Sequence, residues 1–67
     1  MTLFEYFETE PPGSIAEMAD YLGISRVWMS QLIHEKKKPS HVLAKRIELA
    51  TQGLVTKEEL RPDVFLV

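Results

Sequence analysis

The side chains best suited to molecular recognition lie close together in the middle of this 67-residue chain. Arg26 and Ser30 are four residues apart. Val27 and Gln31 share that spacing, so a helix would present all four side chains on one face. Arginine can donate two hydrogen bonds to guanine, glutamine can read adenine, and valine can contact a thymine methyl group. We therefore predict that these four residues contact base edges in the major groove of DNA.

A run of lysines follows the predicted base-reading residues. Lys36, Lys37 and Lys38 are consecutive, and Lys45 lies farther along the chain. Lysine contacts to phosphates position a protein on DNA and supply salt-sensitive affinity without reading the base sequence. A solvated run of charge is the simpler alternative for such lysines. The residues expected to contact the DNA backbone are Ser14, Ser25, Trp28, His34, Lys36, Lys37, Lys38 and Lys45.

Charge is distributed unevenly along the chain, although the net charge is only -2. Residues 1–25 contain five acidic residues and no basic one, whereas residues 26–46 contain six basic residues and one acidic residue. Because salt screens charges that are more than roughly 8 Å apart, distant acids do not cancel this local positive charge. The middle of an acidic chain can therefore attract phosphate.

Several of these residues have an alternative structural role. Ser14 and Ser25 stand where helices are expected to begin, so they are helix caps first, and the N–H groups beside them favour phosphate oxygens. Trp28 lies next to the expected core face, where packing on the following helix competes with a contact to DNA or to a partner protein. Arg26 could instead be a solvated surface side chain, although its place on the outward face of the helix favours a base contact.

Composition argues against several other classes of protein. The chain has no cysteine, and its histidines, His34 and His41, lack the further ligands that a zinc site needs. No apolar run is long enough to span a membrane, and the N-terminal residues lack the basic start of a signal peptide. No side-chain cluster has catalytic spacing, and a core this small offers little room for a pocket. We therefore expect a cytoplasmic protein that is not an enzyme and that uses no metal or cofactor.

Helical periodicity and helix-start residues predict one all-α domain of five short helices spanning residues 1–67. The expected helices cover residues 3–9, 14–23, 25–34, 41–51 and 56–60. The expected N-caps are Thr2, Ser14, Ser25, Ser40 and Thr56. Glu17 and Glu59 would complete capping boxes with the second and the last of these caps.

The second and third expected helices have the spacing of a helix-turn-helix. Gly23 provides the tight turn between them, and Ala19, four residues earlier, is small enough for a close crossing. The apolar residues expected to pack these helices into the core are Ile15, Met18, Ile24, Met29, Leu32 and Ile33. In this motif the second helix lies in the major groove, which is where the predicted base-reading residues fall.

The chain ends in an apolar tail, which we expect to be short and extended. "DVFLV" has four apolar residues in five positions and follows Pro62. Phe65 could pack on Phe4 or Phe7 of the same chain. Alternatively, residues 64–67 could form the surface of a homodimer or bind a partner protein, and the homodimer is favoured because two-fold dimers dominate small oligomers.

Four stretches of the sequence resemble a known family: "LGIS", "SQLIHEKKKPS", "AKRIELAT" and "VTKEELRPDVF". From about Ile15 to Phe65, the chain resembles the Cro-like and YdaS-like prophage regulators of the lambda-repressor-like superfamily. The resemblance implies a compact five-helix lambda-repressor-like domain that represses promoters by binding operator DNA, often as a dimer. Members often carry a glycine in the loop after the recognition helix. The matching residues 34–38 keep the positive charge but contain no glycine, which predicts a differently shaped loop.

Two functions remain open at the level of sequence. The leading one is a transcriptional regulator that binds double-stranded operator DNA. The alternative is an antitoxin-type interaction module that neutralises a partner protein, with DNA autoregulation as a secondary role. The apolar tail is the feature that would discriminate between them, since a partner-binding protein needs an apolar surface.

Overall fold

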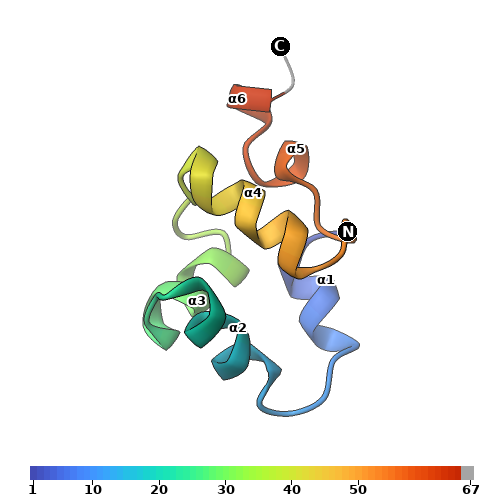
Figure 1. The fold of residues 1–67 in the computed structure, drawn as a ribbon, viewed down its shortest axis with the longest axis vertical. Helices are drawn as coiled ribbons and strands as arrows, with labels where there is room; N and C mark the ends of the chain where they lie inside the picture. Colours follow the sequence, from blue (N-terminus) through green and yellow to red (C-terminus); the bar gives the residue numbers. More distant parts are fainter. Residues whose placement is uncertain (66–67) are drawn as a thin grey trace.

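Six helices form within residues 1–65, the part of the chain that the computed structural model describes (Figure 1). They are α1 (Leu3–Glu8), α2 (Ser14–Leu22), α3 (Arg26–Ile33), α4 (His41–Ala50), α5 (Lys57–Leu60) and α6 (Pro62–Phe65). No strand occurs in that range, so the predicted all-α class is confirmed. The predicted number of five helices is wrong, because residues 62–65 form a further helix. None of the helices in this range is long and apolar enough to cross a membrane.

Side chains cap four of the predicted helix starts. The hydroxyls of Ser25 and Ser40 accept hydrogen bonds from the backbone N–H groups three residues later, at 3.0 and 3.1 Å. Thr2 and Thr56 each form a complete capping box with the glutamate three residues later. These bonds satisfy N–H groups that the first turn of a helix leaves unpaired. They therefore fix where α1, α3, α4 and α5 begin.

Ser14 does not cap α2, and its predicted capping box with Glu17 is wrong. Gly13 takes the N-cap position with a φ of 92°, and its carbonyl accepts a hydrogen bond from the Glu17 N–H at 3.1 Å. Gly13 adopts this left-handed conformation without the strain that a side chain would cause. The helix consequently begins at Ser14 itself, whose side chain lies one position past the cap.

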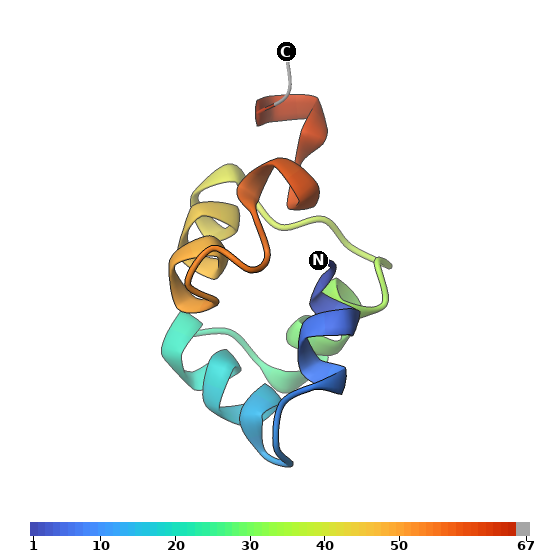
Figure 2. The same ribbon diagram turned by 90° about the vertical axis from the view of Figure 1, so that its right-hand side faces the viewer.

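One apolar cluster fills the space between the helices. Its buried members are Leu3, Met18, Ala19, Leu22, Met29, Leu32, Ile33, Ile47 and Val55. Helices that follow each other pack together, α2 on α3, α4 on α5 and α5 on α6, and the contacts of α1 with α3 and of α2 with α4 complete the core. Figure 2 shows α1 beside α3 and α4 beyond the end of α2. The core therefore connects α3 to elements on both sides of it in the sequence.

The link between α4 and α5 is fixed by a buried threonine. The Thr51 hydroxyl accepts a hydrogen bond from the Val55 N–H at 3.1 Å, and it lies within donating distance of the Glu48 carbonyl at 3.2 Å and of the Val55 carbonyl at 3.3 Å. Thr51 is 1% exposed, so the Val55 N–H is paired away from water. The pairing places Val55 in the core at the start of the C-terminal segment.

The predicted extended tail is wrong for residues 62–65, which form α6. Pro62 stands at its first position, where the fixed φ of proline suits a helix and its missing N–H is not needed. Asp63 lies in the first turn, where a negative charge is favoured by the helix dipole. The helix projects from one end of the molecule (Figure 1). Residues 66–67 of the predicted tail lie outside the described residues.

Phe65 packs toward α4 and α5. Its ring centroid lies 5.9 Å from Nζ of Lys45 and 5.7 Å from Nζ of Lys57. Cations at this range are attracted to the face of an aromatic ring. The position differs from the contact with Phe4 or Phe7 that the sequence offered as one alternative.

Candidate nucleic-acid interface

A three-residue turn joins α2 to α3. Gly23 ends α2 in the predicted left-handed conformation with a φ of 74°, and the Ile24 N–H donates to the Ala19 carbonyl at 3.0 Å. These bonds satisfy carbonyl groups in the last turn of α2. Ser25, two residues after Gly23, is the N-cap of α3. The turn between the two helices is therefore short and hydrogen-bonded at both ends.

The helix α3 has one buried face and one exposed face. Its three predicted core residues are buried, which confirms the predicted register. Arg26, Val27 and Ser30 are exposed, and Gln31 is half-buried. Val27 is 69% exposed, a high value for an aliphatic side chain. The exposed face therefore combines a guanidinium, a hydroxyl, an amide and an aliphatic group, and its contact with DNA bases stays a prediction.

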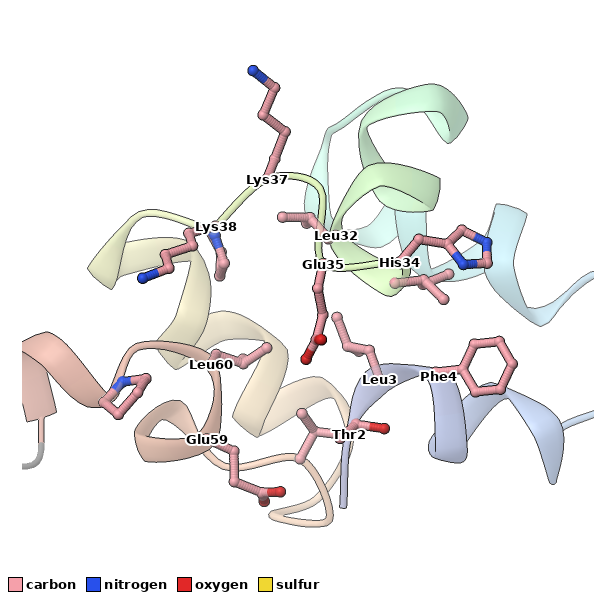
Figure 3. A pocket seen from close by; sticks show the side chains of 14 residues that line it. Thr2, Leu3, Phe4, Leu32, His34, Glu35, Lys37, Lys38, Glu59 and Leu60 are labelled. Carbon is pink, nitrogen blue, oxygen red and sulfur yellow. The ribbon is translucent and has the colours of Figure 1, made fainter.

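Two other predicted contact residues of α3 have structural partners. Trp28 is half-buried against the core, which fits the packing role weighed for it above. The His34 ring lies 5.9 Å from the Phe4 ring, with an angle of 57° between the ring planes. Figure 3 shows these two side chains next to each other, where the end of α3 meets α1. His34 is therefore drawn toward α1, away from the N-terminal half of the exposed face.

Residues 34–40 connect α3 to α4, and residues 35–40 of this connection are here termed the lysine loop. Glu35 adopts the left-handed conformation with a φ of 59°. The loop therefore contains a left-handed residue although it lacks the glycine that family members often carry there. The N–H groups of Lys36 and Lys37 both donate to the Gln31 carbonyl, at 2.8 and 3.3 Å. Lys36, Lys37 and Lys38 are exposed, and Lys37 and Lys38 extend in different directions in Figure 3. The loop presents three ammonium groups beside the end of α3.

The two basic residues of α4 have different surroundings. Arg46 donates to the carbonyls of Leu22 and Tyr21, both at 3.1 Å. Its positive charge thus lies at the C-terminal end of α2, where the helix dipole favours a cation. Lys45, a predicted phosphate contact, is exposed and has Phe65 nearby. The structural role of Arg46 was missed by sequence reasoning, because its partners lie more than twenty residues away.

Arg61 links the lysine loop to α6. Its Nη1 donates to the Pro39 carbonyl at 2.8 Å, while its Nε and Nη2 donate to the two carboxylate oxygens of Asp63, both at 2.9 Å. The hydrogen bonds from Arg61 hold the pKa of Asp63 at about 2, below its usual 3.8. Sequence reasoning missed this link, although the "RPD" spacing is a local signal for the pair of Arg61 and Asp63.

A groove of about 640 Å³ lies beside the lysine loop (Figure 3). Apolar residues of α1 and α3 line one side, including Leu3, Phe4 and Leu32. Glu59 and Leu60 of α5 line another side. Within the described residues, no group of three or more histidine, aspartate or glutamate side chains is placed to hold a metal ion.

The described residues form a small all-helical fold with a polar helix face and a basic loop on its surface. The chain belongs to the family described as bacterial toxin YdaS, whose model matches residues 9–66. A protein of Escherichia coli K12 named prophage transcriptional regulatory protein is 33% identical over 60 residues, which cover 90% of this chain and 91% of that protein. The predicted resemblance to YdaS-like prophage regulators is thereby confirmed.

Proposed function

We propose that this protein is a sequence-specific DNA-binding transcriptional regulator in which α2, the turn and α3 act as a helix-turn-helix. The observation that carries the proposal is the exposed face of α3, with Arg26, Val27, Ser30 and Gln31 on one side of a helix whose other side is buried. In a helix-turn-helix, the second helix enters the major groove, and its N-terminal residues face base edges. These four residues are thus the proposed operator-reading set.

The lysine loop supplies the proposed backbone contacts. Lys36, Lys37 and Lys38 follow α3 directly and are exposed, which suits ammonium groups that meet phosphates at the edge of a groove. Such contacts bind every DNA sequence about equally and weaken with salt. The Ser25 end of α3 is a second proposed phosphate contact, since N–H groups at a helix start favour anions.

The named relative supports a regulatory role, since it is called a prophage transcriptional regulatory protein. The family description names a toxin instead, which favours a protein-interaction role as the second candidate. That role includes the antitoxin-type module considered from sequence.

A footprint on DNA flanking the protein's own gene tests the proposed function. We expect protection of a short site, and a palindromic site would indicate a homodimer that engages two half-sites. The control is a competitor of random sequence at the same salt concentration, because salt sets the non-specific affinity. Equal affinity for flanking and random DNA would contradict sequence-specific regulation and favour the interaction role.

A further inference from the structure

The two ends of the lysine loop are held by different parts of the chain. At its start, the backbone N–H groups of Lys36 and Lys37 are bonded to the end of α3. At its far end, the Pro39 carbonyl accepts a hydrogen bond from Arg61, which lies 22 residues later. Pro39 is also buried. The three lysines therefore stand on a short segment that is tied down at both sides.

Arg61 is itself fixed in orientation by Asp63. Both carboxylate oxygens accept from the guanidinium at 2.9 Å, in the two-point geometry that arginine favours. The Arg61 side chain is 22% exposed and that of Asp63 is 50% exposed, so the arginine is the more enclosed partner. A lysine at position 61 would keep the charge but could not bind both oxygens and the Pro39 carbonyl in one plane.

By electrostatics alone, the negative charge of Asp63 should weaken DNA binding, because it repels phosphate. Its carboxylate is negative, and the positive charge of Lys38 lies close enough to stabilise it slightly. Removing a negative charge near the lysine loop would strengthen attraction to phosphate. A role in positioning predicts the opposite sign, because the loop would lose its anchor.

We propose that Arg61 and Asp63 are positioning residues, which hold the lysine loop so that Lys36, Lys37 and Lys38 meet the DNA backbone together. This inference rests on the proposed DNA-binding function. It assigns the C-terminal segment a part in DNA binding, even though α6 lies at one end of the molecule. The "RPD" sequence would then serve to orient the arginine that holds the lysine loop.

The central experiment measures the affinity and salt dependence of four proteins for one DNA duplex of random sequence, because phosphate contacts do not depend on base sequence. They are the wild type, Arg61→Lys, the triple variant K36A/K37A/K38A, and a variant that carries Arg61→Lys together with the three alanines. We expect Arg61→Lys to weaken binding roughly three- to tenfold, the range for losing a hydrogen bond or two, and to flatten the salt dependence. In the triple-alanine background, Arg61→Lys should have no further effect, since the groups that it positions are gone.

A charge-matched pair of variants tests the sign. Asp63→Asn should weaken binding, by less than Arg61→Lys, although it removes a negative charge. Asp20 is an exposed carboxylate of α2, and Asp20→Asn should leave DNA binding unchanged or make it slightly tighter. Tighter binding by Asp63→Asn would overturn the inference and leave only an electrostatic effect.

Amide hydrogen exchange in the free protein gives a readout that needs no DNA. Arg61→Lys should speed exchange at Lys36 and Lys37 while leaving the turn between α2 and α3 unchanged. Unchanged exchange in the loop, wild-type affinity of Arg61→Lys, or an undiminished effect in the triple-alanine background would each overturn the inference. If the wild type and the triple variant instead bind DNA equally, the inference is overturned together with the proposed loop contacts, whereas the proposed base contacts of α3 are tested separately by the footprint.

Discussion

The two ends of α3 are fixed by different means. At the N-terminal end, Gly23 and Ser25 build the turn with hydrogen bonds that reach no farther than five residues. At the C-terminal end, the lysine loop turns at Glu35 and is closed by Arg61, 22 residues beyond Pro39. The end of α3 proposed to read bases is therefore held by its own neighbours, whereas the end proposed to contact phosphates also depends on a distant segment.

The largest expected effect separates the two ends by specificity. Arg26→Ala and Gln31→Ala should each weaken operator binding by roughly 1–3 kcal/mol and leave binding to random DNA nearly unchanged, because each removes a base contact. Anisotropy titrations with operator and random duplexes at one salt concentration measure this. An equal loss of affinity for both duplexes would mean that these residues contact the DNA backbone. The two ends of α3 would then not differ in what they contact.

The next effect tests the local turn. Gly23→Ala should lower the free energy of unfolding by about 1–2 kcal/mol, because a side chain in the left-handed region is strained. Apart from the two neighbouring residues of the chain, no atom lies within 4 Å of the position that the new methyl group would take, so backbone strain is the expected cause. The control is Gly53→Ala, whose φ of 83° gives similar strain after α4. Urea unfolding should show similar losses, and only the variant at position 23 should also lower operator affinity.

A smaller effect of opposite sign is expected at the other end. Glu35→Gly should raise the free energy of unfolding by about 0.5–1 kcal/mol, since glycine relieves the left-handed strain but costs more entropy on folding. Gln52→Gly is a matched control, because Gln52 has a φ of 56° in a similar turn. Glu35→Gln separates the loss of charge from the change in backbone. A destabilised Glu35→Gly would mean that the Glu35 side chain itself holds the loop.

The smallest expected effect is the dependence of fold stability on acidic pH through Asp63. The pKa of Asp63 is lowered to about 2 by its hydrogen bonds with Arg61. A lowered pKa means that the pair stabilises the fold above pH 3.8 and that this contribution is lost as the pH falls toward 2. A carbon-13 titration of the carboxyl group should therefore give a midpoint near 2. In Arg61→Gln the midpoint should rise toward 3.8, and an unchanged midpoint would assign the shift to another group.

The same contrast explains how far the sequence predicts the structure. The caps at Ser25 and Ser40 and the turn at Gly23 were predicted correctly, because each depends on bonds to residues a few positions away. The second helix start was misplaced by one residue, since Gly13 competed with Ser14 for the cap. Periodicity also predicted the buried side of α3, and hence which residues of the candidate site are exposed.

What the sequence did not predict depends on partners far along the chain. The hydrogen bonds of Arg46 to the end of α2 and of Arg61 to Pro39 join residues more than twenty positions apart, which helical periodicity does not relate. Sequence reasoning counted Arg46 with the free positive charge, whereas the fold uses it to hold α2 against α4. The helical turn at residues 62–65 was missed because a single turn carries almost no periodic signal.

The packing order of the helices has a kinetic consequence. Most helix pairs that touch are adjacent or next but one in the chain, and such local topologies fold in roughly microseconds to milliseconds. The bond between Arg61 and Pro39 joins residues on either side of α4 and α5, so we expect the lysine loop to become ordered after these helices have docked. When the folded chain opens locally, the same segment should open first. Limited digestion with trypsin would then cut after Lys36 and Lys37 before it cuts after Arg46, whose side chain is engaged with α2.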